Sequence, residues 1–281
     1  MATHVKSVED ETSDSLASIA KEFETDFKLT DEVLAYVQGL LTKGQVKFTK
    51  LRGLNGGVIY LATSIIAKGC KTFRAIKAAA LAGCGQDASI LLRALFESTI
   101  ALLYILQRDS KRRAALYGAY EAQRRLVLVE ETRKTPGQKR FFKRVDLQRA
   151  TAKVDQWTKL VTATEIASVR KHWAGPGGLE AAAKKLGGGW RRLYMMYRYL
   201  SAFSHGSDSS AHMFLPEGTD TPVLKLLPGT DELDRVLPMA CLHLLAMAER
   251  FDQRLGLGIE KDIKTLTDRS LALAKSRAAK K

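Results

Sequence analysis

Apolar residues recur every three or four positions along most of the chain, and no proline precedes Pro136. This spacing places apolar side chains on one face of a helix, so the pattern predicts an all-α protein built as a helical bundle. A glycine-rich break at 175–178 separates two of the predicted helices. The pattern predicts helices at residues 9–25, 30–50, 56–82, 86–107, 110–134, 138–172, 178–204, 231–255 and 259–276.

One region, near residues 212–229, lacks the helical pattern. It holds three of the six prolines, and this composition predicts a long loop or a small hairpin. From the changes in charge and pattern we predict three parts. These are an acidic N-terminal helical extension (1–32), a helical bundle domain (33–258) and a C-terminal helix with a basic tail (259–281).

The charge is strongly basic and unevenly distributed. The chain carries 45 Lys and Arg against 30 Asp and Glu, a net charge of +15. Residues 1–32 have a net charge of −6, whereas residues 107–154 have a net charge of +9. Solvated helix faces are one explanation for such clusters, and a surface that binds nucleic acid is the other. The candidate nucleic-acid-binding residues are Lys111, Arg112, Arg113, Arg124, Arg125, Lys139, Arg140, Lys143 and Arg144.

The sequence lacks the motifs of several enzyme classes. It has no phosphate-binding P-loop and no dinucleotide fingerprint, and its histidines and cysteines show no metal-ligand spacing. We therefore expect no metal and no cofactor. The longest apolar runs, 58–67 and 99–106, are shorter than the roughly 20 residues of a membrane-spanning helix. With no signal-peptide pattern at the N-terminus, we expect a cytoplasmic protein that does not contact a membrane.

A polar stripe at the end of one predicted helix is the first candidate for chemistry. Arg198, Ser201 and His205 are spaced so that their side chains project from one helix face. An imidazole transfers protons near neutral pH and a guanidinium holds phosphate oxygens, so the stripe suits phosphoryl chemistry on RNA. The alternative is structural, with His205 at a helix end and Arg198 paired to an acid.

A second candidate lies on the apolar segment from Ser89 to Gln107. Arg93 and Glu97 are four residues apart there, and charged groups on a buried helix need partners. They form a structural ion pair, or Glu97 orients Arg198 or His205 from another helix. The sequence leaves both open.

The two candidate segments together resemble a known family. Leu92-Arg93-Ala94-Leu95-Phe96-Glu97, combined with Tyr197-Arg198-x-x-Ser201-x-x-x-His205, resembles a widespread family of uncharacterised bacterial helical proteins that is distantly similar to the HEPN superfamily. The resemblance implies a dimeric helical bundle of the toxin–antitoxin or phage-defence kind. It also implies RNA as a partner, together with a cognate antitoxin or defence-system protein.

Active HEPN proteins are metal-independent endoribonucleases. The resemblance therefore implies that Arg198 and His205 promote attack of a ribose 2′-hydroxyl on the neighbouring phosphate, often in a site shared across a dimer. Ser201, Glu97 and Arg93 complete the candidate catalytic set. In those nucleases the residue after the arginine is usually polar, whereas this chain has Tyr199. The alternative is a non-catalytic module that binds nucleic acid or a partner protein through its basic face.

Overall fold

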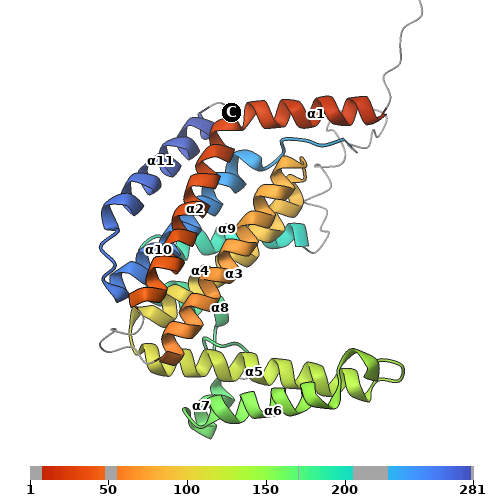
Figure 1. Ribbon diagram of the computed structural model, residues 1–281, viewed down its shortest axis with the longest axis vertical. Coiled ribbons are helices and arrows are strands. Elements are labelled where there is room, and N and C mark those ends of the chain that lie inside the picture. Colours follow the sequence, from red (N-terminus) through yellow and green to blue (C-terminus); the bar gives the residue numbers. More distant parts are fainter. Residues whose placement is uncertain (1–7, 48–55, 170, 205–226, 280–281) are drawn as a thin grey trace, which may run out of the picture. The chain divides into compact units, whose positions relative to one another are not determined.

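The computed structural model describes residues 8–47, 56–169, 171–204 and 227–279, and these residues confirm the predicted all-α class (Figure 1). No strand occurs among them. The predicted loop or hairpin at 212–229 lies outside the described residues except for its last three. In chain order the helices are α1 (Val8–Glu22), α2 (Glu24–Lys47), α3 (Gly56–Leu81), α4 (Gly85–Gln107), α5 (Ser110–Lys134), the short 3₁₀ helix η2 (Lys139–Phe141), α6 (Arg144–Thr158), α7 (Ala163–Ser168), α8 (Gly178–Leu186), α9 (Trp190–Ser204), α10 (Leu233–Leu255) and α11 (Glu260–Ala278).

Two predicted helices are each divided in the structure. The predicted helix 138–172 is divided into η2, α6 and α7, because capping interactions begin new helices within it. The Lys143 backbone N–H donates to Asp146 (2.8 Å) at the start of α6, and the Thr162 backbone N–H donates to Glu165 (2.7 Å) at the start of α7. The predicted helix 178–204 is divided into α8 and α9 by a glycine run, in which Gly187 has φ +73°. A left-handed residue ends a helix, and glycine adopts that conformation without steric cost.

The chain forms two compact units. The first comprises Met1–Lys50, Ser64–Leu102 and Arg192–Lys281, and the second comprises Leu51–Thr63 and Leu103–Arg191. The boundaries that we predicted at residues 32 and 258 stay predictions.

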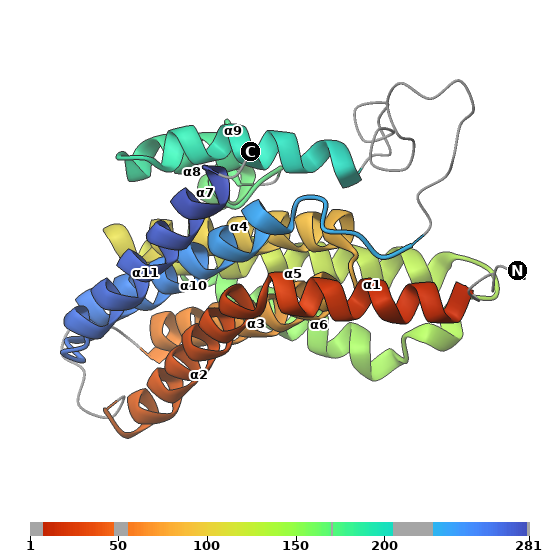
Figure 2. The same cartoon turned by 90° about the horizontal axis from the view of Figure 1, so that it is seen from above.

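In the first unit, α2 packs against α10 and α11 (Figure 2). Buried Phe23 and Phe27 join Leu233 and Leu237 in one apolar cluster. The contact between the ends of the chain is also ionic, because Arg277 on α11 binds the buried carboxylate of Asp26 at 2.5 Å. Arg269 on α11 adds a bidentate pair with Glu32, at 2.5 and 3.1 Å. Part of the acidic N-terminal charge is therefore neutralised by the C-terminal helix.

Helix α4 supplies much of the core. Leu95, Ile100 and Leu102 have no exposed surface. Within the described part of the chain, α4 is the helix whose length and composition would allow it to cross a membrane, with a mean hydropathy of 1.7. Yet 67% of that window is buried inside the protein. A core helix of a bundle has the same composition, so α4 is compatible with a soluble protein.

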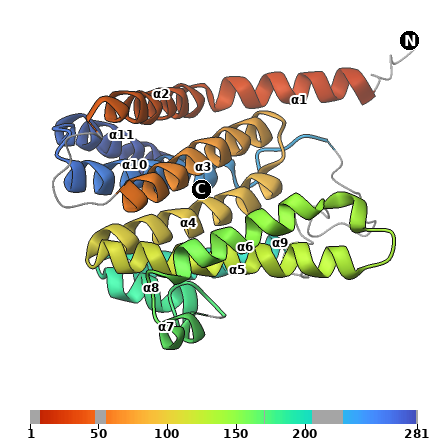
Figure 3. The ribbon, with the colours of Figure 1, turned by 60° about the horizontal axis from the view of Figure 1, so that its bottom comes forward.

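The second unit is organised around an antiparallel hairpin of α5 and α6 (Figure 3). The facing side of α5 is made of small residues, and the Trp157 indole of α6 packs against Ala115, Ala119 and Ala122. A Cβ atom on Gly118 would lie 2.4 Å from two atoms of that indole. The close approach of the two helices therefore depends on the missing side chain at Gly118.

We predict that Gly118→Ala destabilises the second unit, although alanine is the better helix former. The added methyl group must displace a packed indole, an overpacking that costs about 2 kcal/mol and outweighs the roughly 1 kcal/mol gain in helix propensity. All three tryptophans lie in this unit, so urea unfolding followed by tryptophan fluorescence reports on it.

The matched control is Gly39→Ala in α2. No atom lies within 4 Å of a Cβ added there, so the same substitution should stabilise the protein, as followed by circular dichroism. An unchanged or raised urea midpoint for Gly118→Ala would contradict the steric argument.

Candidate functional site

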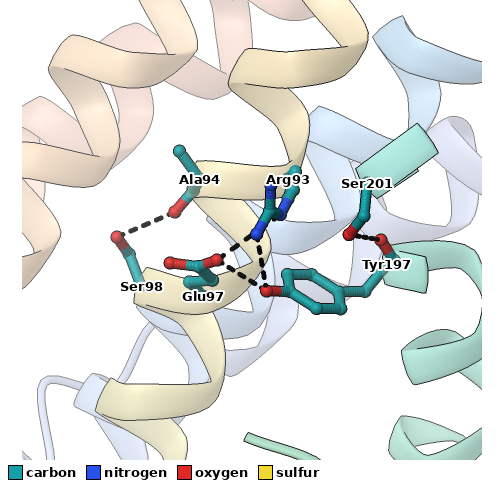
Figure 4. Close-up of polar contacts among 6 residues, drawn as sticks. All are labelled: Arg93, Ala94, Glu97, Ser98, Tyr197 and Ser201. Atoms are coloured by element: carbon teal, nitrogen blue, oxygen red, sulfur yellow. Dashed lines mark hydrogen bonds and ion pairs between the residues drawn. The ribbon is translucent and has the colours of Figure 1, made fainter. Parts of the chain in front are cut away.

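The side chain of Tyr197 on α9 joins two charged residues of α4, Arg93 and Glu97 (Figure 4). Arg93 Nη2 donates to the Tyr197 hydroxyl at 3.1 Å, and that hydroxyl donates to Glu97 Oε1 at 2.8 Å. Arg93 Nε also lies 3.6 Å from the same Glu97 oxygen. The structural ion pair is thus the one of our two interpretations that the described residues show, with Tyr197 as an unforeseen third member.

Aromatic rings surround this network. The Tyr197 ring stacks on Phe96, with centroids 5.4 Å apart, and on Tyr194 at 5.5 Å. The Phe96 ring also makes a T-shaped contact with His243 from α10, with centroids 5.3 Å apart. Burial is the main reason that the pKa of Tyr197 is raised. The phenol therefore stays protonated at neutral pH and keeps donating to Glu97.

Arg198 follows Tyr197 directly and occupies a different face of α9. Successive helical residues are rotated by about 100°, so the contact of Tyr197 with α4 turns Arg198 away from that helix. The Arg198 side chain is exposed. It makes no hydrogen bond or ion pair within the described part of the chain. Its guanidinium is therefore available to bind an anion.

The other two members of the predicted stripe are Ser201 and His205, and the structure describes only the first. The Ser201 hydroxyl is half-buried and donates to the carbonyl of Tyr197 at 2.8 Å, so its proton is used within α9. His205 lies outside the described residues. The structure therefore places Arg198 and Ser201 one turn apart and leaves the third member of the stripe as a prediction.

Tyr199, the aromatic residue that follows Arg198, contacts residues on the other side of α9. Its hydroxyl donates to Glu232 Oε1 at 3.3 Å, and the same oxygen binds Arg235 Nη2 at 3.0 Å. Burial first, and then the charge of Glu232, raise the pKa of Tyr199. The aromatic side chain thus has a structural role that a short polar residue would not fulfil.

Most of the candidate nucleic-acid-binding residues are exposed on the second unit. This holds for Lys111, Arg112, Arg124, Arg125, Lys139, Arg140, Lys143 and Arg144. Arg112 is exposed but also paired, with Nε 2.5 Å from Glu165 Oε1.

Arg113 differs from the others, because its side chain is buried. Its Nη1 donates to the Tyr104 carbonyl at 2.5 Å and to Gln107 at 3.2 Å, and the guanidinium lies 3.8 Å from the centre of the Tyr104 ring. Burial lowers the pKa of Arg113. Its contacts hold the end of α4 to the start of α5, so we exclude Arg113 from any surface that binds a ligand.

Comparison with known proteins gives one family. Residues 60–221, more than half of the chain, match a family of unknown function, DUF5677. The matched segment contains all five candidate catalytic residues and the entire α5–α6 hairpin. No curated protein and no solved structure matches the chain.

We predict that His243 makes the first unit acid-sensitive. Burial lowers the pKa of His243 from its ordinary 6.5 to about 4, so between these values the unfolded chain binds a proton that the folded protein does not. Stability should therefore fall as the pH drops through this range, by about 2.5 kcal/mol between pH 7.5 and 4.5 from this residue alone.

Urea unfolding of wild type and His243→Gln at the two pH values measures this effect. The variant should lose about 2.5 kcal/mol less than wild type over the interval. Equal pH dependence in wild type and His243→Gln would contradict the prediction.

Proposed function

The chain belongs to DUF5677, and we propose that it is an RNA-directed protein that holds the phosphate backbone through the exposed cations of the α5–α6 hairpin. The observation that carries this proposal is the cluster at the tip of the hairpin. Lys139, Arg140, Lys143 and Arg144 fall within six residues and are all exposed. None of them has an ion pair with the residues that the structure describes.

Unpaired surface cations of this density favour a polyanion over a plain solvated face. Two other cations of the hairpin do have acidic partners: Lys134 pairs with Glu131 at 3.0 Å and Arg112 pairs with Glu165. At the tip the like charges repel one another, and a bound phosphate backbone would relieve that repulsion while releasing its own counterions.

We predict that the double variant Lys139→Gln/Arg140→Gln weakens RNA binding by removing two phosphate contacts. The slope of log K against log salt should become shallower by about 1.4, because each contact with a single strand contributes about 0.7. Fluorescence anisotropy with a labelled oligoribonucleotide at several salt concentrations gives both the affinity and the slope.

The matched control is Lys261→Gln/Lys264→Gln, which removes the same charge from exposed positions on α11. This control should keep the wild-type slope. If both double variants lower the affinity equally, only net charge matters and the hairpin is not the binding surface. If wild type binds no RNA, the alternative of a partner protein bound through the basic face takes its place.

A second candidate function, metal-independent endoribonuclease, is favoured by the exposure of Arg198. The contacts of Tyr197 with α4 leave Arg198 at the exposed surface of α9, and its guanidinium is not paired to an acid among the described residues. In the proposed reaction His205 accepts the proton of a ribose 2′-hydroxyl, whose oxygen attacks the adjacent phosphorus. The bond to the 5′-oxygen breaks, that oxygen takes up a proton, and Arg198 stabilises the extra charge on the phosphate.

A nuclease of this kind implies further properties. The resemblance to HEPN proteins makes us propose a homodimer that acts in the cytoplasm as a toxin or phage-defence protein, held in check by a cognate partner. Expression of the wild-type protein would then arrest growth, and light scattering of the purified protein would give the mass of a dimer.

We predict RNA cleavage in the presence of EDTA, with 2′,3′-cyclic phosphate ends, that is lost in both Arg198→Ala and His205→Ala. Arg192→Ala is the matched control, because it removes an exposed arginine from the same helix outside the motif, and it should cut as wild type does. RNA that is bound but not cut by wild type would leave the non-catalytic binding module as the function.

A further inference from the structure

A groove of about 550 Å³ lies entirely within the second unit, between the N-terminal part of α3 and the α5–α6 hairpin. Its lining combines aromatic rings with charged side chains. Tyr60 and Trp157 supply rings, Arg124, Arg125 and Lys153 supply positive charge, and Glu121 supplies a carboxylate. No residue of this groove belongs to the candidate catalytic set.

The aromatic part of the groove contains one exposed ring. Tyr60 is 65% exposed, whereas Trp157 is 8% exposed because its indole fills the seam of the hairpin. The Lys153 ammonium lies near both rings, 5.9 Å from the centre of Tyr60 and 5.8 Å from that of Trp157. Tyr60 therefore offers a flat surface with a cation at its side.

The charged part of the groove is positive overall. The two arginines and the lysine outnumber the one carboxylate, which leaves a net charge of +2. Arg125 and Glu121 are exposed, and neither has a hydrogen bond or ion pair in the part of the chain that the structure describes. A ligand that fits this pattern has an anionic group for the cations and a flat ring for Tyr60.

We propose that this groove binds one unpaired nucleotide of a single-stranded RNA. The base stacks on Tyr60. Stacking on an aromatic side chain tolerates any base, because every base has a flat face. The flanking phosphates are held by Arg124 and Arg125, and Glu121 accepts a hydrogen bond from an exocyclic amino group or a ribose hydroxyl. This inference rests on the proposed RNA binding and extends it, because the tip of the hairpin holds any phosphate backbone, whereas the groove selects an unpaired strand.

The selectivity follows from the geometry of the ligand. In duplex RNA the bases are stacked on each other and cannot reach a protein ring, whereas a single strand can turn a base outward. A duplex therefore gains only the phosphate contacts.

The test compares a labelled single-stranded oligoribonucleotide with a duplex of the same sequence, using fluorescence anisotropy. We expect wild type to bind the single strand about tenfold more tightly than the duplex, since one stacked base contributes roughly that factor. Tyr60→Ala should remove the preference and keep the duplex affinity. Tyr60→Phe, which retains the ring, should keep the preference.

Phe141→Ala is the matched control, because Phe141 is 64% exposed and lies beside a cation of the same unit but does not line the groove. It should keep the single-strand preference. A wild type that binds both RNAs equally, or a Tyr60→Ala variant that behaves as wild type, would overturn the proposal while leaving the RNA-binding function intact.

Two further outcomes are distinguishable. If neither RNA binds wild type, the proposed function itself fails and the groove proposal fails with it. If AMP binds in a way that depends on Tyr60 while oligoribonucleotide binding does not, the occupant is a free nucleotide and the strand proposal is overturned.

Discussion

The partly buried charges of α4 are the constraint on which the candidate catalytic region depends. The Tyr197 hydroxyl binds both side chains, accepting from Arg93, which is mostly buried, and donating to Glu97, which is about half exposed. This contact also fixes the rotation of α9. Once Tyr197 faces α4, the helical repeat turns Arg198 toward solvent. The structural contact of Tyr197 with α4 therefore determines that Arg198 is the side chain exposed to a ligand.

A comparable constraint shapes the second unit, where it is steric rather than electrostatic. The Trp157 indole lies against Gly118 and a row of alanines, so α5 and α6 approach closely. Because that indole is held in the seam, Lys153 one turn earlier on α6 is placed beside it and near Tyr60. The contact of Trp157 with α5 therefore both packs the hairpin and positions the cation of the groove.

Helical periodicity predicted the class and most of the helices, because burial of an apolar face leaves a regular trace in the sequence. It failed at Thr162 and at Gly187, where local capping and positive φ end helices without interrupting the apolar pattern. The pairing of Arg93 with Glu97 was predictable from their spacing, but the third member was not, since Tyr197 lies about a hundred residues away and only packing brings it there. The row of small residues around Gly118 was a signal for close helix contact that the periodicity alone did not reveal.

The structure also separates two kinds of basic residue that look alike in the sequence. Arg113 and Arg277 have most of their surface buried, and they bind carbonyls, a carboxylate and aromatic rings within the fold. The acidic N-terminal segment and α11 likewise pair their charges with each other. The charges of these side chains are therefore paired within the folded protein. The cations at the tip of the α5–α6 hairpin have no ion pair with the residues that the structure describes, and their like charges repel one another. This repulsion is the reason that our proposal of a bound polyanion rests on the tip of the hairpin rather than on the net charge of the whole chain.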